Sequence, residues 1–343
     1  MERKVKKYMF VSLVLAFLVI GFTLFMTLFK LNKVAKNQEQ VPLKSEQLIL
    51  GFSQIGSESA WRTRNTTSIF EAAAENNIQI LFDDAQQKQE NQLKAIRSFI
   101  VYQVDVIAFV PIVETGWDNV LQEAKDAGIP VIIVDRQIAS DPSLYAGFLG
   151  EDGFKEGKAA GEFLLNKIKN FHEKKWNVLE LSGTANSSVV ISRAEGFRSV
   201  IAQNPNISII HSEDGDFLRS RGKEIMDRIL KENKGLSYNN KPIDIIYSHN
   251  DSMTLGLLDS FAENNIDSKK TIIISIDAEQ KSIDALIEGK LNCVVECNPN
   301  LGPTLMTLVK AIAEGKSIPR ITYMQETVFT ENDDFSTYEP RGY

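Results

Sequence analysis

The sequence predicts an α/β protein made of two doubly wound parallel-sheet lobes joined by a hinge. From residue 48 onward, short apolar runs rich in β-branched residues alternate with helical stretches, which is the pattern of βα units. The alternation restarts after Gly153 with a long amphipathic stretch, Phe154–Ile168, so two blocks of such units follow each other. The run Ile129–Val134 is apolar without alternation, as expected of a strand buried on both faces of a parallel sheet. At 343 residues the chain is long enough for both lobes.

The predicted strands are short apolar runs bounded by polar or glycine-containing segments. They are Leu48–Phe52, Ile78–Phe82, Val104–Val110, Val131–Val134 and Tyr145–Leu149 in the first block, and Val178–Leu181, Ile207–His211, Ile243–Ser248, Thr271–Ile276 and Leu291–Val295 in the second. Between them, Lys88–Tyr102 and Gly116–Ala127 are predicted helices; the first repeats apolar residues at helical spacing, and Gly128 ends the second.

Composition, net charge and cysteine content disfavour several classes of function. The chain is 43% hydrophobic and 24% charged, which is typical of a globular protein. Its net charge of -7 argues against a nucleic-acid partner, because binding phosphates requires a basic face. Cys293 and Cys297 would lie roughly 13 Å apart on one strand, beyond disulfide reach. No histidine is near them in sequence, so neither a metal ligand nor a cofactor is predicted.

Residues 1–30 predict a basic cytoplasmic end followed by a transmembrane anchor, and 31–47 a linker. Tyr8–Phe29 carries no charge and has about the 20 residues that a helix needs to cross a bilayer. A long, cleaved signal peptide is the alternative, although no small-x-small cleavage site is evident. Lysines on both sides of the run specify its orientation only weakly.

Polar residues follow the predicted strands at the edge where open α/β sheets bind ligands. These loops are Ser53–Arg62, Asp83–Gln87, Asp135–Arg136, Ser182–Thr184 leading to Arg193, Asp216–Phe217, His249–Asp251, Asp277 and Glu296–Asn300. Carboxylates and amide carbonyls accept hydrogen bonds from hydroxyl groups, and guanidinium groups donate two at once. An aromatic face such as that of Trp61 or Phe217 can cover a sugar ring. Acids and bases together, without an excess of arginine, indicate an uncharged polyol ligand.

Each of these residues has a structural alternative. Asp135, Asp277 and Asn250 are also residue types that cap helices, and Asp251 is predicted to be such a cap. Arginines at 136 and 193 could lie on the surface, and Trp61 could belong to the core. The polar residues of loop 83–87 are predicted to stabilise a turn or cap a helix and not to contact the ligand. Recurrence at the same edge of both sheets favours a ligand site for the others.

Several stretches resemble the periplasmic sugar-binding proteins of the ribose/galactose (type I) class, and most closely the galactofuranose-binding proteins of bacterial ABC importers. They are GFSQIGSESAWR (51–62), QQKQENQLKAIRSF (86–99), ETGWDNVLQEAKDAGIPVIIVDR (114–136), GDFLRSRGKEIM (215–226), HND (249–251) and SID (275–277). The resemblance covers the chain from about Leu48 to the C-terminus.

The resemblance implies a set of sugar contacts shared between two lobes. They are Glu58, Ser59, Trp61, Arg62, Asp135, Arg136, Arg193, Phe217, Asn250 and Asp277. Cys297 also falls where the wider class has ligand-lining residues. The resemblance further implies three hinge crossings, with 48–151 and about 298–325 in the N-terminal lobe. Residues 152–297 and about 326–343 would then form the C-terminal lobe.

The predicted function is extracytoplasmic capture of a monosaccharide by hinge closure, for an ABC permease in the membrane. An alternative with the same site is an anchored sensor, for example of a pentose such as xylose, that signals to a membrane histidine kinase. A glycosidase using two of Glu58, Asp135 and Asp277 is disfavoured, because nearby arginines would keep these acids ionised. Gly51–Ile55 lacks the second glycine of a nucleophile elbow, which disfavours a serine hydrolase. A DNA-binding regulator would need a helix-turn-helix where the apolar run stands. No catalytic residue is predicted.

Overall fold

The computed structural model describes Gly21, Met26 and Gln47–Tyr343. The chain divides into two compact units, Met1–Gln47 and Leu48–Tyr343, and the second unit holds both predicted lobes. Apart from Gly21, Met26 and Gln47, the predicted anchor and linker lie outside the described residues. Within the described part of the chain, no helix has both the length and the apolar character to cross a membrane.

The first lobe is built on a six-stranded parallel sheet with the order β13-β5-β4-β3-β1-β2. Its strands are β1 (Ile49–Gln54), β2 (Gln79–Asp84), β3 (Val106–Phe109), β4 (Val131–Asp135), β5 (Gly147–Gly150) and β13 (Ile321–Tyr323). Every residue of β3, β4 and β5 is buried, as the unbroken apolar runs predicted, whereas the edge strands β2 and β13 are partly exposed.

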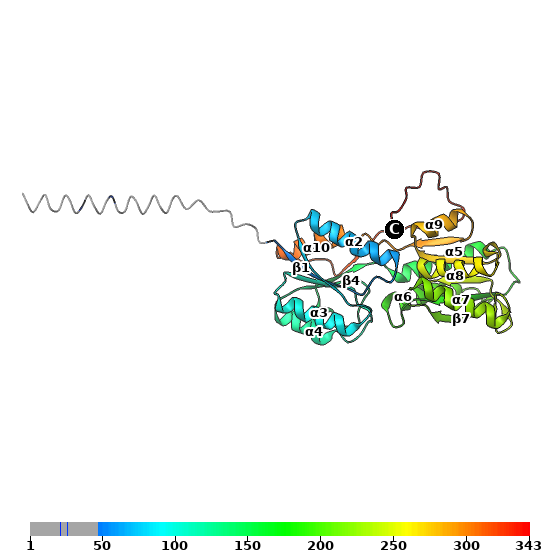
Figure 1. The fold of residues 1–343 in the computed structure, drawn as a ribbon, viewed down its shortest axis with the longest axis horizontal. Helices are drawn as coiled ribbons and strands as arrows, with labels where there is room; N and C mark the ends of the chain where they lie inside the picture. The colour runs from blue at the N-terminus through cyan, green and yellow to red at the C-terminus, as the bar shows by residue number, and fades with distance from the viewer. Residues whose placement is uncertain (1–20, 22–25, 27–46) are drawn as a thin grey trace, which may run out of the picture. The chain divides into compact units, whose positions relative to one another are not determined.

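Helices cover both faces of this sheet. They are α2 (Ala60–Glu75), α3 (Gln89–Val101), α4 (Asp118–Asp126) and α10 (Gly302–Ala313), with a short 3-10 turn, η1 (Pro142–Leu144). Helices α2 and α10 lie together on one face although they are far apart in sequence, and α3 and α4 lie on the other (Figure 1). One hydrophobic core joins the helices to the sheet.

The second lobe repeats the plan with the strand order β14-β12-β11-β10-β6-β7. Its strands are β6 (Trp176–Ser182), β7 (Ile207–Asp214), β10 (Ile245–Ser248), β11 (Ile272–Asp277), β12 (Cys293–Glu296) and β14 (Val328–Thr330). A two-stranded hairpin, β8 (Ser237–Tyr238) with β9 (Lys241–Pro242), lies outside this sheet. All neighbours are parallel except β12 and β14, so one edge of the sheet is antiparallel.

Two hydrophobic clusters fill the two faces of the second sheet. Its helices are α5 (Gly153–Ile168), α6 (Ser188–Ile201), α7 (Arg219–Asn233), α8 (Asp251–Glu263) and α9 (Gln280–Ile287), with a 3-10 turn, η2 (Ser268–Lys270). Helices α5 and α6 contribute to one cluster, and α7, α8 and α9 to the other. The predicted fold class, two doubly wound lobes of parallel sheet, is confirmed, with β14 as the antiparallel exception.

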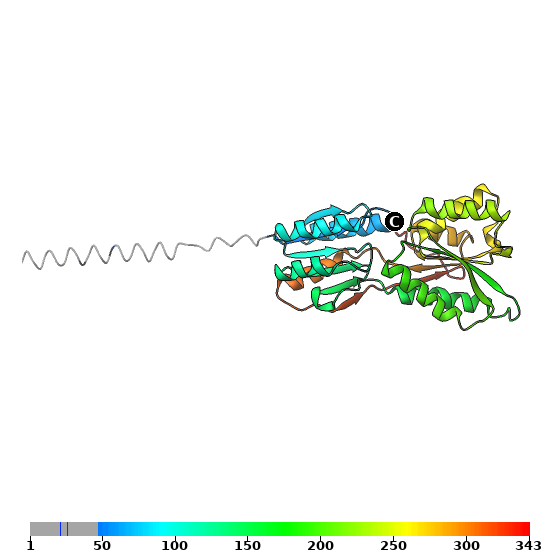
Figure 2. The same ribbon diagram turned by 90° about the horizontal axis from the view of Figure 1, so that it is seen from below.

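The chain passes between the two sheets three times. The passages lie between β5 and α5, between β12 and α10, and between β13 and β14 (Figure 2). Strands β1, β4, β6, β10 and β11 all end in polar residues, and their carboxyl ends meet near these passages.

Candidate ligand-binding site

A cavity with about 310 Å³ of empty space is lined by loops from both sheets. Its walls include every residue of the predicted site, namely Glu58, Ser59, Trp61, Arg62, Asp135, Arg136, Arg193, Phe217, Asn250 and Asp277, together with Val189 and Cys297.

Arg62 is the centre of the first-lobe half of the cavity. It follows the N-cap of α2, where the hydroxyl of Ser59 accepts a hydrogen bond from the Arg62 amide at 3.0 Å. Its Nε lies 2.9 Å from Glu58 Oε1, and its Nη2 lies 2.6 Å from Asp135 Oδ2. Burial alone would lower the pKa of Arg62, but the carboxylates of Asp135 and Glu58 raise it above its usual value. The buried Nη1 has no partner among the described residues, so one donor is left for a ligand.

Arg136 is the least well paired of the buried arginines. It is 2% exposed, and its nearest carboxylate oxygens are Glu58 Oε1 at 3.7 Å and Asp135 Oδ2 at 3.9 Å. Burial and the charge of Arg62 lower its pKa to about 10, against the pull of Asp135 and Glu58. Its guanidinium carbon lies 5.2 Å from the centre of the Phe217 ring. The guanidinium therefore faces the cavity with donors to spare.

Arg193 holds the second-lobe half. Its Nε and Nη2 lie 2.6 and 3.2 Å from the two carboxylate oxygens of Glu156, and its Nη1 donates to the carbonyl oxygen of His249 at 2.6 Å. Helices α5 and α6 approach closely here, because a Cβ at Gly157 would lie 2.0 Å from the Arg193 carbonyl oxygen. Asp277 Oδ1 is 3.9 Å from Arg193 Nη2, and burial raises the pKa of Asp277 despite this arginine.

Asn250 lines the cavity and also caps α8. Its Oδ1 accepts a hydrogen bond from the Met253 amide at 3.0 Å, while its Nδ2 donates to the Phe217 carbonyl oxygen at 3.1 Å. The cap predicted at Asp251 is wrong, because Asn250 takes that position. Asp251 is instead the first residue of the helix, where its buried carboxylate accepts hydrogen bonds from the Ser275 hydroxyl and the Glu279 amide.

Three cavity residues other than glycine have a positive φ angle, which is strained for an L-amino acid. They are Asp135 at 63°, Phe217 at 60° and Asp277 at 125°. Such strain collects where the surroundings fix a side chain for a function. Phe217 is held further by Gly183, since a Cβ there would overlap the aromatic ring at 2.0 Å.

Trp61 belongs to α2 but packs against the second lobe. Its indole Nε1 donates to the Cys297 carbonyl oxygen at 2.6 Å, and its backbone amide donates to Glu279 Oε1 at 3.2 Å. The side chain is 4% exposed and joins the cluster of apolar residues between α5, α6 and the second sheet. Trp61 is thus both a core residue and a wall of the cavity, so the two interpretations of its sequence position are compatible.

The sequence did not point to Val189, Glu156 or Glu279. Val189 is an ordinary apolar residue of α6, and Glu156 and Glu279 belong to α5 and the start of α9, where an acid is unremarkable. The loop 83–87 forms a turn, as predicted. Asp84 Oδ1 accepts a hydrogen bond from the Gln86 amide at 2.9 Å, and neither residue lines the cavity.

Two doubly wound lobes that together line a polar cavity define a binding protein of the periplasmic type. Residues 50–317 match the family described as periplasmic binding protein domain, and the chain belongs to this family. It is 41% identical to the galactofuranose-binding protein YtfQ of Escherichia coli (strain K12), over 86% of this chain and 93% of that protein.

Two solved structures are similar in both sequence and fold. One is a protein from Mycobacterium smegmatis in complex with β-D-fucofuranose, with 42% identity, a TM-score of 0.78 and coverage of 83% of this chain and 91% of the other. The second is the periplasmic binding protein component of the arabinose ABC transporter from Shewanella sp. ANA-3, bound to α- and β-L-arabinofuranose. Its identity is 40% and its TM-score 0.77, over 82% of this chain and 92% of the other.

Proposed function

We propose that this protein captures a monosaccharide in its furanose form and delivers it to an ABC importer. The observation that carries the proposal is the meeting of three buried arginines and three buried or nearly buried carboxylates from both lobes in one small cavity. The guanidinium groups of Arg62, Arg136 and Arg193 donate hydrogen bonds, and the carboxyl groups of Glu58, Asp135 and Asp277 accept them, which suits a neutral ligand with many hydroxyl groups. The relatives named above are binding proteins and not enzymes.

The unpaired donors indicate how the sugar is held. Arg136 and the free Nη1 of Arg62 donate to sugar oxygens, and Asp135 and Asp277 accept from hydroxyl groups. Trp61 and Phe217 supply apolar faces that exclude water from the ring. A furanose is proposed because the two similar solved structures contain fucofuranose and arabinofuranose.

Hinge closure brings the two halves of the site onto the sugar. The moving bodies proposed are 48–151 with about 298–325, and 152–297 with about 326–343. Contacts of Trp61 with Cys297 and Glu279 join these bodies, and they form only when the bodies are close together. A ligand must favour the closed state by about 5.5 kcal/mol to change a 1:99 population to 99:1, which a few charge-assisted hydrogen bonds can supply.

The full chain should be stabilised by aldoses that reach a furanose form. In a thermal-shift series, a sugar at 100 times its Kd adds about 2.7 kcal/mol to the free energy of unfolding. We expect equilibrated galactose, D-fucose or L-arabinose to raise the unfolding temperature, and myo-inositol, which has no furanose form, to leave it unchanged. The absence of a shift with any aldose at millimolar concentration would contradict the proposal.

We further propose that the protein acts outside the cytoplasm and is held at the membrane by residues 1–30. The support is the uncharged run of about 20 residues, the span of a bilayer core. The full chain should stay in the membrane pellet after washing at alkaline pH, whereas a chain that begins at Leu48 should be released. A full chain that is also released would contradict the anchor. Purification from membranes with a permease, and not with a histidine kinase, would distinguish the importer from a sensor.

A further inference from the structure

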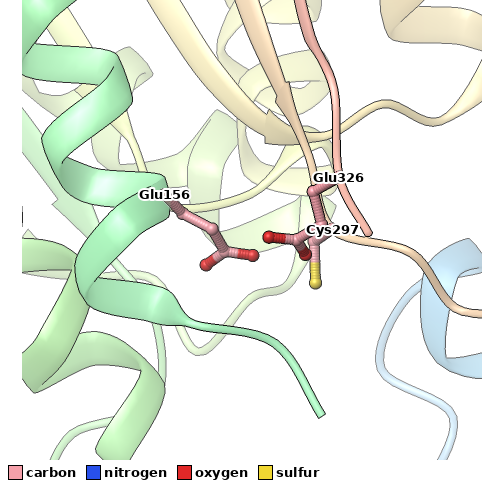
Figure 3. A group of neighbouring side chains, drawn as sticks. All are labelled: Glu156, Cys297 and Glu326. Atoms are coloured by element: carbon pink, nitrogen blue, oxygen red, sulfur yellow. The ribbon is translucent and has the colours of Figure 1, made fainter. Parts of the chain in front are cut away.

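Each of the three passages between the sheets carries one titratable side chain, and these side chains interact electrostatically. Glu151 lies between β5 and α5, Cys297 directly follows β12, and Glu326 lies between β13 and β14. Glu156, in the first turn of α5, completes the group. Carboxylate oxygens of Glu156 and Glu326 and the Sγ of Cys297 all lie within 4.8 Å of one another, and the two carboxylates face each other beside the sulfur (Figure 3).

Glu151, Glu156 and Cys297 are buried and Glu326 is partly buried, with little positive charge nearby. Glu151 is 6% exposed, and neither of its carboxylate oxygens has a hydrogen-bond partner among the described residues. Burial, together with the charges of Asp135, Glu326 and Glu156, raises the pKa of Glu151. The arginine that these acids interact with is Arg193, which already pairs with Glu156. Three carboxylates and a thiol therefore share one guanidinium, and unpaired buried charge is costly.

We propose that this hinge cluster, Glu156, Cys297 and Glu326, binds a divalent transition metal ion such as Zn²⁺. A thiolate with carboxylates is a ligand set that Zn²⁺ accepts, at about 2.3 Å from sulfur and 2.0–2.2 Å from oxygen. Ligand atoms around a tetrahedral zinc ion are roughly 3.3–3.8 Å apart. The three ligand atoms here lie within 4.8 Å of one another, so side-chain movements of about 1 Å would bring them to that spacing. Burial raises the pKa of the Cys297 thiol, which favours its protonated form without metal. When a metal ion binds the sulfur, the thiol proton is released to solvent.

The position of the cluster gives the metal a role in the hinge. Cys297 and Glu326 lie in two of the passages, and Glu156 lies in the first turn of α5, directly after the third. A bound ion would therefore tie together the segments that must bend during closure. Cys297 also lines the sugar cavity, and Glu156 holds Arg193. Metal and sugar should then alter each other's affinity by the same factor, because binding coupling is reciprocal.

Cobalt substitution tests the thiolate ligand directly. Full chain freed of metal with a chelator is titrated with Co²⁺, and we expect one equivalent to give a sulfur-to-cobalt absorption band in the near ultraviolet. Cys297→Ser should remove the band. Cys293→Ser is the matched control, since Cys293 is also a fully buried thiol, four positions earlier, and it should keep the band. Zn²⁺ should displace Co²⁺ from the wild type. It should raise the unfolding temperature of the wild type and of Cys293→Ser, but not that of Cys297→Ser.

Glu326→Gln provides a second test that keeps the thiol. Glu326 is only partly buried, so the variant should fold, and its Zn²⁺ affinity should fall at least about tenfold. No cobalt band in the wild type would overturn the proposal, as would a band that survives Cys297→Ser or unchanged affinity in Glu326→Gln. A cluster that holds only protons and water would give the first of these results.

Discussion

Asp135→Asn should weaken sugar binding by about 2–3 kcal/mol, which is roughly 30- to 150-fold in Kd. The carboxylate of Asp135 lies 2.6 Å from Arg62 Nη2 and 3.9 Å from Arg136 Nε, so it orients both guanidinium groups. Asparagine tolerates the positive φ of 63° at this position, which keeps the backbone and removes only the charge. Titration calorimetry with the sugar found in the thermal-shift series measures the loss.

Asp84→Asn is the matched control for this prediction. Asp84 ends β2 at the same edge of the first sheet, but it is exposed and does not line the cavity. Its variant should bind sugar as the wild type does. Equal affinity in Asp135→Asn and the wild type would remove Asp135 from the site, and with it the proposed hydrogen bonds from the sugar to this carboxylate.

The edge of the sheet that carries the site could be predicted from sequence because strand period and burial fix it. Asp135 ends an unbroken apolar run, so its position at a carboxyl end follows from local pattern alone. The same reasoning places Arg136, Asn250 and Asp277. It does not place Trp61 against the second lobe, since that contact depends on how α2 meets Cys297 and Glu279, far away in sequence.

The residues that support the site were not predictable for a related reason. Glu156 lies on the first turn of an amphipathic helix, where acids commonly interact with the helix dipole. Its function as the partner of Arg193 depends on the close contact of α5 with α6, which Gly157 permits. Asp251 was misread because two neighbouring residues could each cap α8, and only packing against Ser275 decides between them. Arg193 was a candidate from the loop after β6, with a helix surface as the alternative, and the resemblance to a family also assigned it to the site.

Arg193→Met should destabilise the fold by about 3–5 kcal/mol, in addition to abolishing sugar binding. The substitution leaves the Glu156 carboxylate, which is 2% exposed, without its counter-ion, and it removes the donor to the His249 carbonyl oxygen. With a typical slope of 1–3 kcal/mol/M, the urea midpoint should fall by about 1–5 M. Equilibrium unfolding in urea without sugar or metal measures this directly.

The double variant Arg193→Met with Glu156→Gln separates the buried charge from the loss of packing. Glutamine keeps the shape of Glu156 but needs no counter-ion, so the double variant should be more stable than Arg193→Met alone. Sugar binding should not return, because the guanidinium that faces the cavity is still missing. A double variant no more stable than Arg193→Met would mean that the pair is not coupled. In that case Arg193 would stabilise the lobe through packing alone, and the electrostatic account of the second-lobe half of the site would fail.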